Sequence, residues 1–103
     1  MRKIEIYKKD KIYATYYWDS GLFAYNSEVF AEKGDFMFAT GGLETKLFHE
    51  VPYLFRRYLP TRGSANFEMM ISRFKADPND EFDIISKVGH GIIAPYSFRG
   101  VLE

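Results

Sequence analysis

The chain contains few residues whose types and spacing could perform catalysis. It has no cysteine, so a nucleophile would have to be a serine or threonine that His49 or His90 activates. No serine lies in a Gly-x-Ser-x-Gly sequence, the strained turn that exposes the nucleophile of many hydrolases. We therefore predict that the chain is not an enzyme and has no catalytic residue, and we interpret both histidines as surface or core-margin residues.

The acidic segment 77–83 is the best candidate for a metal site, because several carboxylates follow one another there. An EF-hand loop needs a central glycine, and this segment has Pro78 and no glycine. Acidic residues are also favoured in the first turn of a helix, and we prefer this interpretation. The glycines at 41–42 and 89–91 lack the Lys-Ser/Thr ending of a phosphate-binding loop. We therefore expect no metal and no cofactor.

Basic and aromatic residues alternate around the middle of the chain, and three interpretations are open. They could bind single-stranded nucleic acid, form a protein interface, or form a solvated helix face. Fourteen basic and fourteen acidic residues leave no net charge, which argues against direct binding to nucleic acid. The protein interface is favoured. Its predicted partner-binding residues are Phe48, His49, Tyr53, Arg56, Arg57 and Arg62.

The composition also favours an interface. Ten Phe, eight Tyr and one Trp are more rings than a core of this size easily holds, so some should be exposed. Tyrosines at the core margin with solvated hydroxyls are the alternative explanation. The length predicts one domain over residues 1–103. No apolar run is long enough for a membrane span, and we expect a cytoplasmic protein without membrane contact.

The first forty residues have the two-residue period of strands. In the second strand, Ile12, Ala14, Tyr16 and Trp18 should share one face and Tyr13, Thr15 and Tyr17 the other, with Trp18 interpreted as core. Asp19-Ser20-Gly21 should form a hairpin turn in which glycine takes a positive φ. The predicted strands are 3–7, 12–18, 22–25 and 36–39, with one helical turn in 26–32.

The second half has helical periodicity and recognisable caps. Ser64 and Asp80 should each cap a helix at its N-terminus, and Gly89 should end the last one in the left-handed C′ position. The predicted helices are 52–59, 65–74 and 81–88, followed by a strand over 92–98 that Pro95 places at an edge or a bulge. This order predicts an α+β fold. We expect a small antiparallel sheet, made of the N-terminal meander and the C-terminal strand, with about three helices packed on one side.

From Leu54 onward the chain resembles the N-terminal subdomain of HipA-type serine/threonine kinase toxins, and its N-terminal meander also follows that family's opening. The resembling residues are Phe55-Arg56-Arg57-Tyr58-Leu59-Pro60, Arg73-Phe74, Phe82-Asp83-Ile84-Ile85, Val88-Gly89 and the strand 92–98. The chain departs from the family at 38–43, where a Ser-Leu-Pro-Leu stretch is usual. It also departs at His90, where the family has an acidic residue, and at Ile93-Ala94, where it has Gly-Ala.

In HipA-like proteins a kinase core follows this subdomain, whereas this chain stops at Glu103. The resemblance therefore implies a HipS-like antitoxin of a bacterial HipBST-type toxin–antitoxin system. Such a protein binds and neutralises a separately encoded HipT/HipA-like kinase, and a HipB-like DNA-binding subunit joins through the complex. Two alternatives stay open: a small module for single-stranded nucleic acid, and a non-functional N-terminal remnant of a split HipA-like kinase.

Overall fold

Strands dominate the first half of the chain, helices dominate the second, and a single strand comes last. The computed structural model describes residues 1–31, 40–56, 61–89 and 96–102. Its elements in chain order are β1 (Arg2–Lys8), β2 (Lys11–Tyr17), β3 (Leu22–Tyr25), α1 (Ser27–Ala31), β4 (Thr45–Leu47), α2 (Tyr53–Arg56), α3 (Ala65–Phe74), α4 (Glu81–Val88) and β5 (Tyr96–Leu102).

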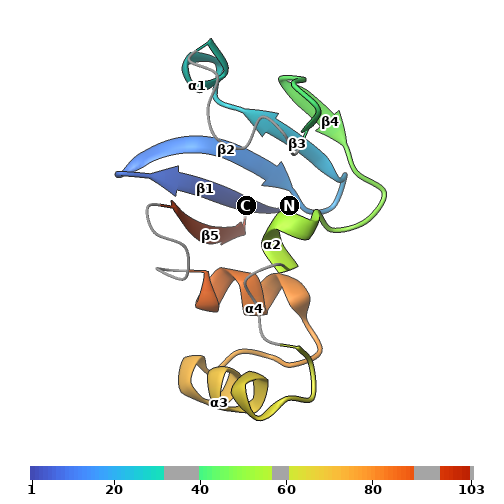
Figure 1. Cartoon of the computed structure of the whole chain (residues 1–103), viewed down its shortest axis with the longest axis vertical. Coiled ribbons are helices and arrows are strands. Elements are labelled where there is room, and N and C mark those ends of the chain that lie inside the picture. The colour runs from blue at the N-terminus through green and yellow to red at the C-terminus, as the bar shows by residue number, and fades with distance from the viewer. Residues whose placement is uncertain (32–39, 57–60, 90–95, 103) are drawn as a thin grey trace.

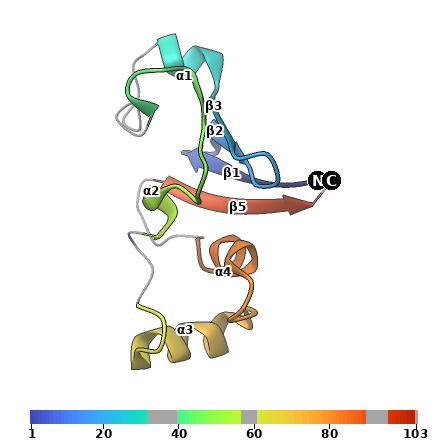
Figure 2. The ribbon, with the colours of Figure 1, turned by 90° about the vertical axis from the view of Figure 1, so that its right-hand side faces the viewer.

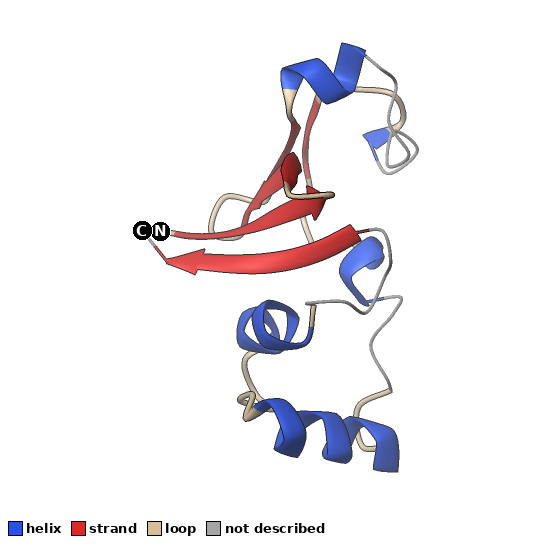
Figure 3. Ribbon diagram, turned by 90° about the vertical axis from the view of Figure 1, so that its left-hand side faces the viewer, coloured by secondary structure: helices blue, strands red, loops and turns tan. Residues whose placement is uncertain are grey.

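The five strands form one antiparallel sheet in the order β4-β3-β2-β1-β5, which confirms the predicted α+β class (Figure 1). β1, β2 and β3 form the predicted meander, and β5 lies at the edge that Pro95 indicated. Helices α2 and α4 lie on one side of the sheet, and α3 lies beyond α4, away from the sheet (Figures 2 and 3). α1 lies at the opposite end. None of the helices in the described ranges is long and apolar enough to cross a membrane.

A β-bulge changes which residues of β2 reach the core. Ile6 pairs with Ala14, but Tyr7 pairs with Ile12, so Tyr13 is the extra residue. The strict alternation predicted for this strand placed Tyr13 on the face opposite Ala14 and Tyr16, but all three belong to the same core cluster, so that prediction is wrong. The side chain is buried, and its ring packs 5.4 Å from the ring of Tyr96.

The N-terminal caps of the two longer helices are confirmed. The hydroxyl of Ser64 accepts a hydrogen bond from the Phe67 N–H at 3.1 Å, and the carboxylate of Asp80 accepts one from the Asp83 N–H at 3.3 Å. These bonds satisfy donors that have no partner inside the helix. The caps fix where α3 and α4 begin, and α4 then packs its buried face against β5.

Gly89 is needed for a different reason from the one predicted. Its φ is −66°, so it is not in the left-handed conformation. A Cβ at this position would lie 2.7 Å from the Cβ of Phe98, and the Phe98 N–H donates to the Gly89 carbonyl at 3.0 Å. The glycine therefore allows the end of α4 to approach β5 closely.

Two strands differ from the sequence prediction. β4 was not expected, because its three residues are all exposed and show no alternation of burial. The strand predicted over 36–39 lies outside the described residues. The last strand continues to Leu102 rather than ending at Phe98, because β5 pairs with the full length of β1.

The helix predicted over 52–59 corresponds to α2, which spans Tyr53–Arg56. The last residues of that prediction lie outside the described ranges.

The ring of Phe55 connects α2 to the sheet and should be a main source of stability. It is 1% exposed and lies 5.0 Å from the ring of Phe98 and 5.4 Å from that of Tyr16. We predict that Phe55→Ala lowers the free energy of unfolding, measured by urea denaturation, by about 3–5 kcal/mol. Leu102→Ala, at an exposed position, is the control and should change it by less than about 0.5 kcal/mol. Equal effects of the two variants would contradict this role.

Candidate protein-binding groove

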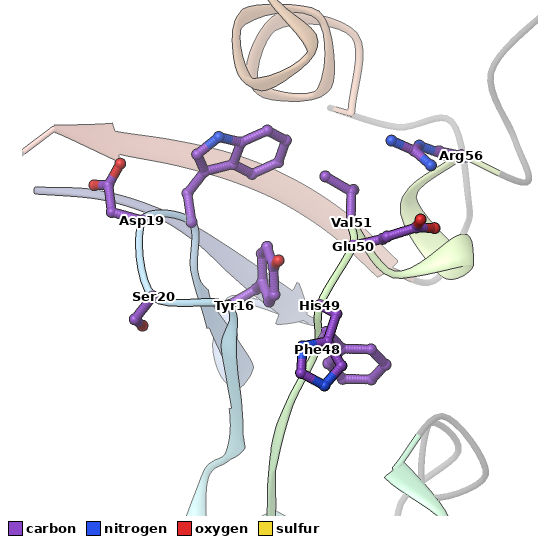
Figure 4. Close-up of a pocket in the computed structure, with 10 residues that line it drawn as sticks. Tyr16, Asp19, Ser20, Phe48, His49, Glu50, Val51 and Arg56 are labelled. Carbon is purple, nitrogen blue, oxygen red and sulfur yellow. The ribbon is translucent and has the colours of Figure 1, made fainter.

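A groove of about 520 Å³ opens between the β2–β3 turn and the segment that leads from β4 to α2 (Figure 4). We call it the Tyr16 groove. Asp19 and Ser20 lie on one side, Val51 and Arg56 on the other, and Tyr16 lies between them. The full lining consists of Tyr16, Trp18, Asp19, Ser20, Gly21, Phe48, His49, Glu50, Val51 and Arg56.

A main-chain contact holds the two sides of the Tyr16 groove together. The Phe48 N–H donates to the Gly21 carbonyl at 2.8 Å, and the Gly21 N–H donates to the Tyr17 carbonyl at 2.8 Å. Gly21 has a φ of +81°, as the predicted hairpin turn requires, and a Cβ there would overlap the carbonyl oxygen of Phe48. Any other residue would therefore strain the turn and push the Phe48 segment away.

Aromatic rings form the apolar part of the groove. The ring of Tyr16 lies 5.9 Å from that of Trp18 and 6.5 Å from that of Phe48, and both pairs have edge-to-face geometry. Behind them, Trp18 packs 5.4 Å from Phe82 on α4. These contacts tie the groove rings to the core, so the binding surface is preorganised.

Two ion pairs lie at the ends of the groove, and in each pair the arginine and the carboxylate neutralise each other's charge. The Arg56 side chain makes a bidentate contact with Glu81, with Nε–Oε1 at 2.6 Å and Nη2–Oε2 at 2.9 Å. At the other end, Arg2 donates to Asp19 through its main-chain N–H at 2.8 Å and through its guanidinium at 2.8 Å. The main-chain bond is the first cause, and the guanidinium bond the second, of a lowered pKa at Asp19.

The groove keeps an excess of negative charge. Among the residues that line it, Arg56 supplies one positive charge against the two carboxylates of Asp19 and Glu50. Glu50 is exposed and makes no ion pair with any residue that the structure describes. Arg56 attracts it only at longer range, so the exposed carboxylate can form an ion pair with a positively charged ligand.

The hydroxyl of Tyr16 is the most unusual group in the groove. The residue as a whole is only 3% exposed, but its hydroxyl, which forms no hydrogen bond within the part of the chain that the structure describes, keeps contact with solvent at the groove. Burial raises the pKa of this phenol, and the nearby Glu81 raises it further while Arg56 lowers it. The group is therefore neutral at physiological pH. No buried side-chain polar atom of the described residues lacks a hydrogen-bond partner, so the Tyr16 hydroxyl is reached by water at the groove, and a ligand can replace that water.

The structure brings together half of the residues predicted to bind a partner. Phe48, His49 and Arg56 all line the Tyr16 groove. Tyr53 is 74% exposed on α2 but does not line it. Arg62 donates to the side chain of Asn79 at 2.8 Å, in a different contact. Arg57 lies outside the described residues.

Sequence reasoning missed several residues of the groove. Tyr16 was expected only as a member of the core face, and Trp18 was interpreted as core although it is half-buried and lines the groove. Glu50 had no motif to mark it. One sequence feature could have indicated Tyr16 and Trp18. They share one face of a strand directly before the Asp19-Ser20-Gly21 turn, and side chains at the end of a strand are more accessible than those at its centre.

The groove is suited to binding a side chain. Ser20 accepts a hydrogen bond from the Leu22 N–H at 3.4 Å, and no hydrogen bond joins it to His49 in the described contacts. Among the described residues, no three His, Asp or Glu side chains lie close enough to hold a metal ion. The groove offers ring surface, the Tyr16 hydroxyl without a hydrogen bond to a described residue, and the exposed carboxylate of Glu50, which makes no ion pair with a described residue.

No protein-family model matches the chain, and no curated protein matches it. The groove and the sequence resemblance are therefore the two sources of evidence on function.

Removal of the Tyr16 hydroxyl should not destabilise the protein. We predict that Tyr16→Phe keeps or raises the free energy of unfolding, by up to about 1 kcal/mol, because no internal hydrogen bond is lost. The matched control is Tyr25→Phe, because Tyr25 is also buried but is hydrogen-bonded to Thr40. This variant should lose about 1 kcal/mol. Urea denaturation of both variants tests the difference, and a clear loss in Tyr16→Phe would show that its hydroxyl has an internal partner.

The Arg2–Asp19 pair should make stability depend on pH. Because the pKa of Asp19 is lowered by folding, its contribution is present above the ordinary carboxyl pKa and disappears as the pH falls through the lowered value. We predict that Asp19→Asn is less stable than the wild type at pH 7, and that the gap closes as the pH falls below about 4. Thermal denaturation from pH 7 to acid pH measures the gap. A gap of constant size would contradict the role of the ionised pair.

Proposed function

We propose that this chain is a HipS-like antitoxin, which binds and neutralises a separately encoded HipT/HipA-like serine/threonine kinase in the bacterial cytoplasm. The Tyr16 groove is the proposed contact surface. The observation that carries the proposal is that Phe48, His49 and Arg56 converge on a groove in which the solvent-accessible Tyr16 hydroxyl has no hydrogen bond to a described residue. A partner that supplies a hydrogen bond to this hydroxyl would gain affinity and specificity.

Two further observations support a protein partner. The α+β fold agrees with what the resemblance to the HipA N-terminal subdomain implies. The groove rings are already packed against the core, so little side-chain entropy is lost when a partner docks on them. Aromatic residues and arginine are also the residue types that contribute most to protein interfaces.

The arginines give less support to the nucleic-acid alternative. Arg56 is paired with Glu81, and Arg62 is bonded to Asn79. A single-strand site needs cations that are free to follow a phosphate backbone between stacked bases. The two described arginines of the predicted cluster are engaged within the protein, so their geometry favours the protein partner.

Binding to the kinase is the direct test. We predict that the chain co-purifies with a HipA-like kinase encoded beside it and suppresses the autophosphorylation of that kinase. In calorimetry, Tyr16→Phe should weaken the complex by about tenfold, which corresponds to about 1.4 kcal/mol for one lost hydrogen bond at the interface. Met69→Ala, at a 69% exposed position on α3 outside the groove, is the control and should leave the affinity unchanged.

Three results would contradict the proposed function. One is the absence of binding at micromolar concentration, and another is binding that leaves kinase activity unchanged. The third is binding of the chain to labelled single-stranded DNA or RNA that weakens steeply with salt, which would support the nucleic-acid module instead.

A further inference from the structure

The Tyr16 groove has the charge and shape of a site for a cation. The guanidinium groups of Arg56 and Arg2 are already paired with Glu81 and Asp19, so the exposed carboxylate of Glu50 makes no ion pair and has only the longer-range attraction of Arg56. An anionic ligand would find no free guanidinium there, and His49 at the rim is the one remaining basic group of the described lining. A positively charged ligand would restore charge balance.

Ring faces on this protein attract cations. Arg2 lies over the ring of Phe82, with its Cζ atom 5.6 Å from the centroid, and Lys46 lies over Phe48, with Nζ at 5.0 Å. Trp18, whose indole is the best acceptor for such an interaction, has no cation over its ring in the described structure. Trp18 is half-buried and lines the groove, so part of its ring surface is accessible there.

We propose that the Tyr16 groove binds an arginine side chain presented by the partner kinase, an inference that rests on the proposed function. The guanidinium stacks on Trp18, donates to the carboxylate of Glu50 and donates to the hydroxyl oxygen of Tyr16. The ring of Trp18, the carboxylate of Glu50 and the hydroxyl of Tyr16 would each contact the bound guanidinium.

Arginine fits these groups better than the other candidates. Its planar guanidinium stacks on an aromatic face and has several donors in one plane, and it is more weakly hydrated than the ammonium of lysine. A neutral aromatic side chain would fill the ring surface but leave the charge of Glu50 unbalanced. An acidic side chain would be repelled by the excess of carboxylates.

The single tryptophan allows a direct test on the whole chain. In nitrogen–proton NMR spectra the one indole N–H signal belongs to Trp18 and reports on the groove. N-acetyl-arginine amide should shift this signal in a saturable way in the millimolar range. N-acetyl-citrulline amide has nearly the same shape without the charge. It should bind about fivefold or more weakly, since a cation–π contact contributes about 1–2 kcal/mol. N-acetyl-phenylalanine amide should also bind more weakly than the arginine probe.

Two variants separate charge from shape. Glu50→Gln should weaken binding of the arginine probe by about fivefold, and Glu68→Gln on α3 is the control that removes the same charge outside the groove and should leave it unchanged. Three results would overturn the proposal: equal binding of citrulline and arginine probes, tighter binding of the phenylalanine probe, or no saturable shift with arginine.

The same variants distinguish this inference from the proposed function. If the kinase binds wild type and Glu50→Gln equally, the arginine site is wrong while the antitoxin function stands. If the arginine probe binds but no kinase does, the chemistry of the groove stands, and both the antitoxin function and the kinase as the source of the arginine fail.

Discussion

The hydrogen bond between Phe48 and Gly21 is the contact on which the geometry of the groove depends. β4 is three exposed residues long, so it contributes little burial to hold the following segment. One main-chain bond contributes only about 0.5–1.5 kcal/mol. The ring of Phe48, which packs 6.1 Å from Phe23 and 6.5 Å from Tyr16, adds the apolar anchor. His49 and Glu50 follow this anchor directly, and their positions are set by it.

In this small domain, one tyrosine hydroxyl contributes to the fold and another is left for a ligand. Tyr13, Tyr16 and Tyr25 all come from the meander and are all buried. Tyr25 is hydrogen-bonded to Thr40, and its hydroxyl belongs to the fold. Tyr16 packs its ring against Phe55 but leaves its hydroxyl without a partner in the described structure. Because the hydroxyl reaches solvent at the groove, a ligand can bond to it without any change in the core.

Much of the fold could be predicted because it follows local rules. Ser64 and Asp80 mark helix starts through bonds that span three residues, and Gly21 marks a turn through its own φ. The features that escaped prediction depend on distant residues. The bulge at Tyr13 is defined by how β2 pairs with β1, and the need for Gly89 comes from Phe98. For the site, residue types indicated Phe48, His49 and Arg56, but only the folded chain shows that Tyr16 and Glu50 lie beside them.

The position of β1 between β2 and β5 has a consequence for the synthesis of the protein. β1 spans Arg2–Lys8, whereas its partner β5 follows much later in the chain, at Tyr96–Leu102. One edge of β1 therefore has no strand to pair with while nearly all of the rest of the chain emerges from the ribosome, and an open strand edge can pair with other chains. Closing a loop of this length also slows folding. The nascent chain is thus exposed to mispairing until its final strand is available.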